Sequence, residues 1–319
     1  ERVKSRTIWR DAGRKSQSAG KNEESGGSKR RSASANSNST LSRIILGFPK
    51  RVLKRTRRSY EKMTQTIITL KPAEGTVGCS PEQRTMEQSL LRGIAIIDKP
   101  KGPTSHEVSE TVKKILSLTR AGHSGTLDPA VTGVLPVALS RGTRIVQFLL
   151  IAPKEYVGVM HLHEDVEELV LRKAVEKFVG KITQLPPVKS AVKRQLRERE
   201  VYAFELLERK EKEVLFRVQC QAGTYVRKLI HDLGQLLGGG AHMAELRRTH
   251  VGPFTEKDLV TLTDLKDACT LWKEEQNEKW LRTLIQPIER AVEHLPKVWV
   301  LDSAIESITH GRDVAIPGI

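Results

Sequence analysis

The distribution of charged and apolar residues divides this chain into two parts that differ in their capacity to fold. Residues 1–62 hold 18 Lys and Arg against 5 Asp and Glu, so 13 of the 16 net positive charges of the 319-residue chain lie there. Residues 1–40 are mainly Ser, Gly, Asn, Lys and Arg. Such a segment buries too little apolar surface to offset the entropy lost on ordering. The composition therefore predicts a disordered basic tail over 1–62, and a packed core formed by later residues.

Three interpretations of this tail stay open. It is rich in Arg and Ser and poor in acidic residues, which is typical of a transit peptide. Its basic run KRVLKRTRRSYEK over 50–62 is equally typical of an RNA-binding arm. The third interpretation is a segment that is not native to the protein, with Met63 and Met86 as alternative starts. Residues 63–92 are interpreted as an N-terminal extension of the folded part.

Two classes of protein are disfavoured by the rest of the composition. The longest apolar run, 145–152, is far shorter than the roughly 20 residues of a membrane-spanning helix. The three cysteines, Cys79, Cys220 and Cys269, form no CxxC pair. This argues against a disulfide scaffold and a cysteine-ligated zinc site, and it favours a reducing, cytoplasmic compartment.

The hydrophobic pattern predicts a mixed α+β fold. Strands are expected over 93–97, 154–162, 202–207 and 214–220, with a buried segment over 133–139 and a strand-like piece over 298–301. Helices are expected after Ser105 as N-cap, over 169–179, and from 223–227 through Leu237, closed by Gly238. Strands outnumber clear βαβ repeats, which favours α+β over a doubly wound sheet.

The loop GHSGTLDP over 122–129 is the densest group of unusual residues. Its small residues allow a ligand to approach the backbone closely, and His123 and Asp128 add two polar groups. An ordinary turn in which Asp128 bonds its own backbone explains the same composition. No Lys follows the second Gly, so the loop is not a phosphate-binding loop of the GxxxxGKS type.

Aromatic and basic residues later in the chain suit RNA. In extended geometry Tyr225 and Arg227 face the same side, where Tyr stacks on a base and Arg holds a carboxylate. Basic clusters on an otherwise nearly neutral part are candidates for phosphate contacts, although such runs are usually solvated faces. The residues concerned are Lys189, Lys193, Arg194, Arg197, Arg199, Arg247 and Arg248.

Five long segments, in this order, closely resemble the TruB/dyskerin family of RNA pseudouridine synthases. They are GIAIIDKPKGPTSHEV over 93–108, AGHSGTLDPAVTGVLPVAL over 121–139, KEYVGVMHLH over 154–163, AGTYVRKLIHDLG over 222–234 and ELRRTHVGPF over 245–254. The resemblance covers about residues 90–319. It implies a mainly antiparallel sheet flanked by helices over 93–297, and the beginning of a small, truncated β-rich PUA domain over 298–319.

The resemblance also implies roles for individual residues. Asp128 matches the catalytic aspartate, Tyr156 the tyrosine that stacks on the target uracil and takes part in proton transfer, and Arg227 the arginine paired with the aspartate. The residues that match substrate-binding positions are His123, which helps extrude the nucleotide, Tyr225, Leu246 and Lys99. No metal and no cofactor is implied.

Three further segments resemble the guide-RNA-dependent branch of the family, which is archaeal and eukaryotic. They are QLPP over 184–187, KSAVKRQLRER over 189–199 and AVEHLPKVWVLDSAI over 291–305. HLHEDV over 161–166, HMAELRRT over 242–249 and EHLPKVW over 293–299 resemble its archaeal members. The implied partners are tRNA, rRNA, a box H/ACA guide RNA and small accessory proteins of that ribonucleoprotein, with the chain as its monomeric catalytic subunit. The implied target is uridine 55 of tRNA, rRNA or both.

Two other hypotheses remain beside the RNA uridine isomerase. One is a catalytically silent scaffold that binds RNA and accessory proteins. The other is a small-molecule enzyme of mixed α+β fold, whose binding would be insensitive to salt because it lacks phosphate contacts.

Overall fold

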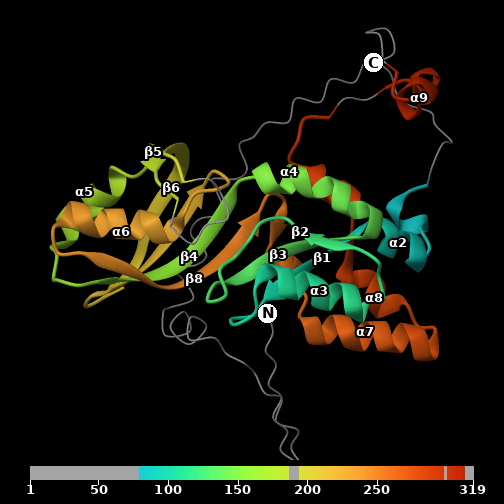
Figure 1. The fold of residues 1–319 in the computed structure, drawn as a ribbon, viewed down its shortest axis with the longest axis horizontal. Helices are drawn as coiled ribbons and strands as arrows, with labels where there is room; N and C mark the ends of the chain where they lie inside the picture. The colour runs from blue at the N-terminus through green and yellow to red at the C-terminus, as the bar shows by residue number, and fades with distance from the viewer. Residues whose placement is uncertain (1–78, 187–193, 298–299, 313–319) are drawn as a thin grey trace, which may run out of the picture. The chain divides into compact units, whose positions relative to one another are not determined.

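The computed structural model describes residues 79–186, 194–297 and 300–312, and in them ten strands form one sheet (Figure 1). Eight strands follow the order β10-β1-β3-β8-β4-β7-β6-β5, while β2 pairs with β3 and β9 with β8. Among these strands only β3 and β8 pair in parallel. The strands are β1 (Gly93–Lys99), β2 (Ala121–His123), β3 (Thr132–Leu139), β4 (Lys154–Leu162), β5 (Gly180–Gln184), β6 (Arg197–Lys210), β7 (Glu213–Cys220), β8 (Ala241–Val251), β9 (Phe254–Thr255) and β10 (Ile285–Pro287). The predicted mixed, mainly antiparallel α+β fold is confirmed.

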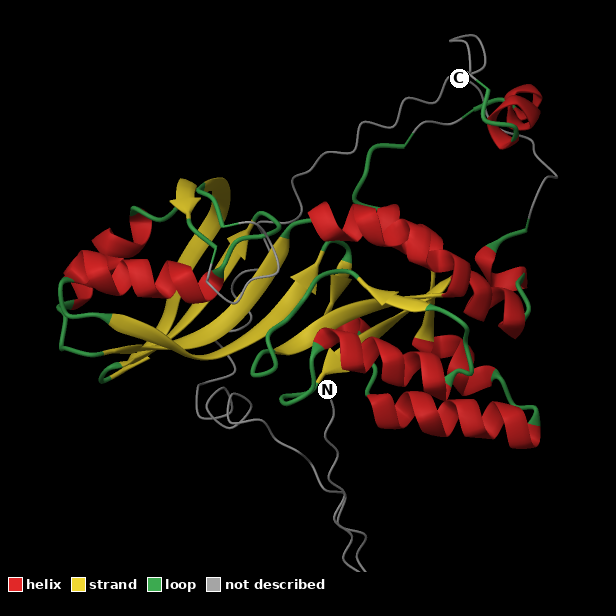
Figure 2. Ribbon diagram, viewed as in Figure 1, coloured by secondary structure: helices red, strands yellow, loops and turns green. Residues whose placement is uncertain are grey.

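Helices cover the two ends of this sheet in separate groups (Figure 2). The α-helices are α2 (Met86–Arg92), α3 (Ser105–Ile115), α4 (Val146–Ile151), α5 (Glu168–Glu176), α6 (Val226–Leu237), α7 (Leu262–Glu275), α8 (Lys279–Leu284) and α9 (Asp302–Thr309). Short 3₁₀ helices are η3 (Pro81–Gln83), η4 (Ser140–Ile145), η5 (Glu256–Asp258) and η6 (Ile288–Val292). One core joins α5 and α6 to β4, β6, β7 and β8, and a second joins α2, α3, α7 and α8 to β1 and β3.

The position of strand β1 in the sheet explains why its sequence is continuously apolar rather than alternating. Ala95 and Ile97 face the second core, whereas Ile94 and Ile96 face a third cluster that includes Leu149 of α4. Both faces of the strand are therefore covered, and a strand buried on both faces needs apolar residues at every position.

Helix α3 begins one residue earlier than the sequence predicts. Thr104, not Ser105, is the N-cap: its hydroxyl accepts from the Glu107 N–H, while the Glu107 carboxylate accepts from the Thr104 N–H. This reciprocal capping box satisfies two backbone donors at the helix start. The prediction of Ser105 as the cap is wrong because Ser105 is the first helical residue and its side chain is fully buried. The Ser105 hydroxyl therefore does not cap the helix and forms its hydrogen bonds with another segment.

The short connection between α6 and β8 depends on two glycines. Gly238 adopts φ +82° and ends the helix in the left-handed conformation, as the sequence predicts. A Cβ on Gly234 would lie 2.0 Å from the backbone nitrogen of Ala241. The start of β8 therefore packs directly against the backbone of α6.

Lys154, the first residue of β4, is a buried cation that caps α4. Its Nζ donates to the carbonyls of Leu149, Leu150 and Ala152 at 3.0, 2.8 and 2.7 Å. These carbonyls lie at the C-terminal end of α4, where the helix dipole favours a cation. Burial, with a smaller contribution from the charge of Arg248, lowers the pKa of Lys154 to about 8.

The pKa of Lys154 predicts a pH dependence of stability. Between about pH 8 and 10.5 the unfolded state keeps a proton that the folded state has lost, so the free energy of unfolding rises with pH. The slope is at most about 1.4 kcal/mol per pH unit for one group. In urea titrations at pH 7 and 9.5 we expect the free energy of unfolding of Lys154→Met to rise less than that of wild type, whereas the exposed Lys173→Met keeps the full rise. Equal pH dependence in the two variants would contradict the assignment.

Several sequence predictions fall outside the described residues. These are the tail over 1–62, residues 63–78 of the extension, Lys189 and Lys193, and much of the segment over 298–319. The described end of the extension packs with the folded part: Met86 and Leu90 are buried in the second core, and Arg84 pairs with Glu289. No helix among the described residues combines the length and apolar character needed to cross a bilayer.

Candidate active site

Asp128 and Arg227 meet although 99 residues separate them in the chain. Asp128 lies in the loop between β2 and β3, and Arg227 is the second residue of α6; their side chains form an ion pair. Both are about half exposed, 51% and 55%, so the pair adds little stability. Its consequence is geometric, because it holds a carboxylate at the surface in a defined orientation.

The loop does contain the ordinary turn that its composition suggests. The Val131 N–H donates to the Asp128 carbonyl at 2.9 Å across Pro129, a residue suited to the second position of a turn. The carboxylate, however, is engaged by Arg227 from another element. The extended arrangement expected for 225–227 is wrong, since the chain is already helical at Val226.

Buried Ser105 fixes the loop immediately before Asp128. Its Oγ donates to the Leu127 carbonyl at 3.2 Å and accepts from the Leu127 N–H at 2.8 Å. Both backbone groups of Leu127 are thus satisfied by one hydroxyl of α3. Sequence reasoning missed this contact, because a Ser near a helix start is ordinarily interpreted as a cap.

We expect Ser105→Ala to slow the reaction catalysed at this site by about 10-fold to 100-fold. The loop that carries Asp128 would shift, and a displacement of a catalytic group on the ångström scale has effects of this size. The variant leaves two buried backbone groups unpaired, which costs roughly 1–3 kcal/mol of stability. The matched control is Ser109→Ala, a buried Ser on the same helix that donates to the Ser105 carbonyl. Single-turnover rates and urea unfolding separate the two: equal loss of rate in both variants would contradict a role specific to the loop.

Lys99 fixes the loop on the other side of Asp128. Its Nζ donates to the carbonyls of Pro100, Pro129 and Val131 at 2.9, 3.2 and 2.9 Å. The side chain is fully buried, and burial, with a further contribution from the charge of Arg248, lowers its pKa to about 8. No part of the side chain reaches the surface, so Lys99 supports the loop, as the resemblance of residues 98–100 to the first family motif implies, and does not contact substrate in this structure.

Tyr156 and Leu246 lie on neighbouring strands of the same hydrophobic core. Tyr156 on β4 is 9% exposed and Leu246 on β8 is 7% exposed. The core they share includes Leu127, next to Asp128, and Val226, next to Arg227. Burial raises the pKa of Tyr156. Four segments distant in sequence therefore converge behind the Asp128–Arg227 pair.

Tyr225 is fixed through its backbone by a residue of β5. The Tyr225 N–H donates to Gln184 Oε1 at 3.0 Å, and Gln184 Nε2 donates to the Tyr225 carbonyl at 3.2 Å. Gln184 is 3% exposed. The sequence contains a signal for it, because the Pro pair that follows ends the strand and leaves its last side chain facing the start of α6.

The expected phosphate contacts from Arg247 and Arg248 are not supported. Arg247 donates to both oxygens of Asp98 and to Glu256 at 2.9, 3.0 and 2.6 Å and is only 17% exposed. Arg248 is 1% exposed, so the prediction that it contacts RNA is wrong for this structure. Both arginines support the sheet from within.

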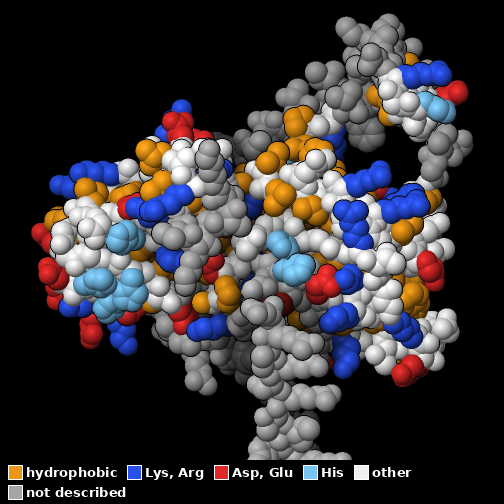
Figure 3. Space-filling model, in the orientation of Figure 1, with side chains coloured by type: hydrophobic (Ala, Val, Ile, Leu, Met, Phe, Trp, Pro, Cys, Tyr) orange, Lys and Arg blue, Asp and Glu red, His pale blue; other side chains and the backbone are white. Residues whose placement is uncertain are grey.

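Of the remaining predicted residues, Arg194 lines a cavity of about 470 Å³ that has Arg227 in its wall. The cavity is lined by Leu185, Pro186, Arg194, Arg227, Lys228, His231, Ala241, His242 and Met243. Arg194 is exposed, and Arg197 and His123 are partly buried. Burial lowers the pKa of His123, and Arg248 contributes in the same direction. Figure 3 shows basic side chains in separate clusters with acidic ones between them.

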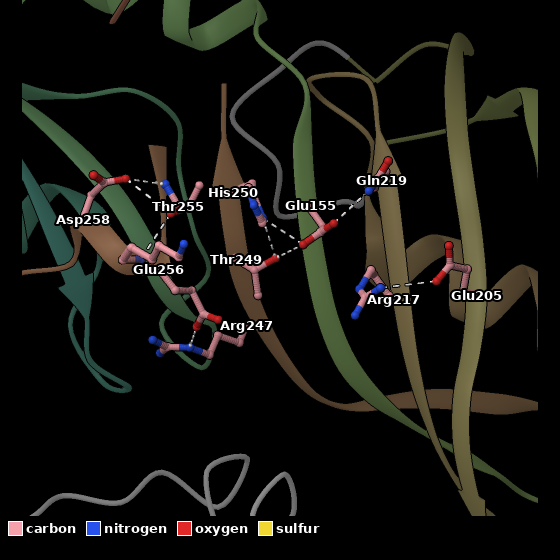
Figure 4. Close-up of polar contacts among 11 residues, drawn as sticks. Glu155, Glu205, Arg217, Gln219, Arg247, Thr249, His250, Thr255, Glu256 and Asp258 are labelled. Carbon is pink, nitrogen blue, oxygen red and sulfur yellow. Dashed lines mark hydrogen bonds and ion pairs between the residues drawn. The ribbon is translucent and has the colours of Figure 1, made fainter. Parts of the chain in front are cut away.

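A buried polar network holds the strands on the other face of β4 (Figure 4). Glu155 accepts from Gln219 Nε2 at 2.8 Å and from Thr249 Oγ1 at 2.6 Å, and its carboxylate lies 2.8 Å from His250 Nδ1. Burial opposes its charge, but these contacts outweigh burial and lower the pKa of Glu155 to about 2. Glu155 thus joins β4 to β7 and β8 directly beside Tyr156. Among the described residues, no group of three or more His, Cys, Asp or Glu is placed to hold a metal ion.

Family models match most of the folded part of the chain. The model described as "TruB family pseudouridylate synthase (N terminal domain)" matches residues 113–169 and 163–226. The model described as "tRNA pseudouridylate synthase B C-terminal domain" matches 227–293, and the DKCLD (NUC011) domain matches 60–109. Asp128, Tyr156 and Tyr225 lie in the first of these, and Arg227 begins the second.

Curated relatives and solved structures agree with these matches. The chain is 52% identical over 262 residues to a "Probable tRNA pseudouridine synthase B" of Methanopyrus kandleri, covering 82% of this chain and 77% of the relative. It is 58% identical over 243 residues to the protein of that name from Thermococcus gammatolerans, covering 76% and 73%.

Two solved structures share the fold over most of the chain. A Cbf5-Nop10-Gar1 complex gives a TM-score of 0.75 at 55% identity, and an H/ACA RNP bound to a substrate RNA containing 2'-deoxyuridine gives 0.72 at 53%. Each covers 78% of this chain and 76% of the matched chain. From the identity, the coverage and the shared fold together it follows that this chain belongs to the TruB family of pseudouridine synthases.

Proposed function

We propose that this TruB-family pseudouridine synthase isomerises specific uridines in RNA, with Asp128 as its catalytic aspartate. The observation that carries the proposal is the Asp128–Arg227 ion pair at the surface, with Tyr156 and Leu246 in the core directly behind it. The targets are uridine 55 of tRNA, rRNA, or both. The folded part over 93–297 is the proposed catalytic domain, and a cytoplasmic location stays a prediction.

The reaction breaks the C–N glycosidic bond of the uridine and joins the uracil to the sugar again through a C–C bond. The enzyme must therefore reach both the base and the sugar of the target nucleotide. The target nucleotide leaves its stack, at a cost of a few kcal/mol. Asp128 acts as nucleophile at the sugar or the base, or as the base in an elimination. Arg227 favours the ionised carboxylate that each route requires.

Tyr156 has two tasks in this scheme. Its ring replaces part of the stacking that the extruded base loses, a contribution of about 1–3 kcal/mol. Its hydroxyl takes part in the removal of the C5 proton after the new bond has formed. Leu246 supplies an apolar wall, and His123 and Tyr225 line the path by which the nucleotide enters.

We assign the RNA contacts that lie beyond the target uracil to the cavity that has Arg227 in its wall. Arg194 and Lys228 supply positive charge there, and Leu185 and Met243 supply apolar surface. Lys189, Lys193 and Arg197 remain proposed contacts. The similarity to Cbf5 in complexes with Nop10, Gar1 and substrate RNA supports a role as the monomeric catalytic subunit of a box H/ACA ribonucleoprotein.

The test is pseudouridine mapping on RNA treated with the purified chain. Transcripts of tRNA and rRNA are incubated with and without guide RNA and accessory proteins, which separates guided from unguided modification. Product at defined uridines, absent with Asp128→Asn, supports the proposal. RNA binding without product under every condition favours the catalytically silent scaffold. Binding that is insensitive to salt favours the small-molecule enzyme.

A further inference from the structure

A fully buried guanidinium lies behind the candidate active site. Arg248 is 1% exposed, its Nε donates to the Val134 carbonyl at 2.8 Å, and its Nη2 lies 3.4 Å from the Gly125 carbonyl. Its third partner is the hydroxyl of Tyr156. Within the described part of the chain none of these partners is a carboxylate. A buried charge is costly unless it is paired, so this one calls for an explanation.

The backbone places Arg248 between β3, the strand that follows the Asp128 loop, and β4, the strand that carries Tyr156. On one side of β8 it pairs with Gly133 of β3, and on the other with Tyr156 of β4. Gly133 has φ +101°, and a Cβ there would lie 2.2 Å from the Arg248 carbonyl oxygen. Only glycine permits this approach, which brings the strand following the Asp128 loop against Arg248.

A strand irregularity sets which residue stands opposite Tyr156. Glu155 pairs with His250, but Tyr156 pairs with Arg248, so Thr249 is the extra residue on β8. The Thr249 hydroxyl donates to the Glu155 carboxylate at 2.6 Å on the other face of the sheet, which holds the bulge (Figure 4). Bulges re-aim side chains, and this one directs Arg248 to the Tyr156 side of the sheet.

We propose that Arg248 is a positioning residue for Tyr156: its buried guanidinium holds the Tyr156 oxygen in place and stabilises the phenolate that accepts the C5 proton. The inference rests on the proposed function, since it assigns the group that supports Tyr156 in that reaction. It explains why the guanidinium lacks a carboxylate, because the anion that compensates it forms on Tyr156 during turnover.

The proton transfer balances without any other reactant. Once C5 has bonded to C1′, it carries both the sugar and a hydrogen, and the ring holds an N1=C6 double bond. The proton passes from C5 to the Tyr156 oxygen, and the C–H electron pair forms the C5=C6 double bond. The N1=C6 pair moves to N1, which takes a proton from solvent. Tyr156 gives its phenolic proton to solvent before this step and regains a proton from C5, so it ends as the neutral phenol.

The surrounding charges are consistent with this role. Besides burial, the positive charge of Arg248 lowers the pKa of Lys99, Lys154 and His123. Burial raises the pKa of Tyr156, while Arg248 acts against that rise through its charge and its hydrogen bond. An excess of positive charge beneath the site favours an anion at the only acidic hydroxyl in contact with Arg248.

The experiment measures single-turnover rates on RNA with uridine or 5-deuterouridine at the target, with any guide RNA and proteins that wild type requires. We expect Arg248→Gln to slow turnover by about 100-fold, the size of a typical acid–base contribution. We also expect it to raise the primary deuterium isotope effect, because C5 deprotonation becomes rate-limiting. In the Tyr156→Phe background, Arg248→Gln is expected to cause little further loss.

Arg248→Lys provides the conservative comparison and a separate readout. It keeps a buried cation, so we expect partial rescue at pH 7. Unlike guanidinium, a buried ammonium loses its proton in the alkaline range, so the activity of Arg248→Lys relative to wild type falls between pH 7 and 10. If Arg248→Gln does not fold, this pH profile carries the test alone.

A purely structural Arg248 gives a different pattern. Its loss slows Tyr156→Phe as much as wild type, leaves the isotope effect unchanged, and makes the Arg248→Lys profile parallel to that of wild type; any of these overturns the inference. Absence of product with wild type itself contradicts the proposed function instead, so the two failures are distinguishable.

Discussion

Replacing Asp128 by Asn is expected to reduce pseudouridine formation by at least about 10³-fold, because the amide is not a nucleophile and cannot accept the proton that an elimination requires. The fold and the RNA affinity are expected to stay close to wild type. Asn is nearly isosteric, and the exposed ion pair with Arg227 contributes little to stability. Single-turnover rates with a saturating RNA and a filter-binding titration measure the two quantities separately.

Asp232→Asn is the matched control for this prediction. Asp232 also pairs with a basic residue of α6, Lys228, four positions away, but it does not touch the loop. Its amide variant is expected to keep wild-type turnover. Residual product formation by Asp128→Asn within tenfold of wild type would exclude Asp128 as the catalytic aspartate.

Arg227→Ala and Arg194→Ala are expected to have opposite effects on turnover and binding. Arg227 holds the Asp128 carboxylate, so its loss should lower kcat by roughly 100-fold to 1,000-fold, as loss of an oriented charge in an active site does. Its RNA affinity should change by no more than about threefold. Arg194 lines the same cavity and has no contact with Asp128 among the described interactions, so its loss should weaken binding and leave kcat unchanged.

Salt dependence distinguishes a phosphate contact from a general loss of charge. Removing one phosphate contact should reduce the slope of log affinity against log salt by about 1 for Arg194→Ala. Arg172→Ala serves as control, because Arg172 is an exposed residue of α5 paired with Glu168. Equal effects of Arg227→Ala and Arg194→Ala on kcat and affinity would contradict this division.

Local patterning was a good guide to the elements. Strand β4 matches its predicted bounds of 154–162, although its residues are buried almost continuously rather than alternately, and helix α6 ends at Leu237 before Gly238 as expected. These signals are local: alternation at period two, and a glycine where only a left-handed residue continues the chain. The start of α3 was misplaced by one residue for the same reason, because Thr104 and Ser105 are both competent caps and only their surroundings decide between them.

The candidate site depended on contacts between distant segments. Composition alone left Asp128 as an ordinary turn residue, and only the family resemblance implied its role and its pairing with Arg227. The fold supplies the geometry of this pair by joining the loop after β2 to the start of α6, 99 residues further along the chain. The family motif over 98–100 indicated that Lys99 supports the loop, but Ser105 acts through the backbone of Leu127, a contact that leaves no mark in a sequence pattern.

The sequence by itself determined the α+β class and the family, while the separation of a basic tail over 1–62 from the folded part stays a prediction. Tertiary structure alone decided what the buried cations do. Lys99, Lys154 and Arg248 look like surface residues by composition, yet each is enclosed. The physical reason is that burial of a charge depends on the partners that other segments bring to it, and those partners follow only from how the strands pair.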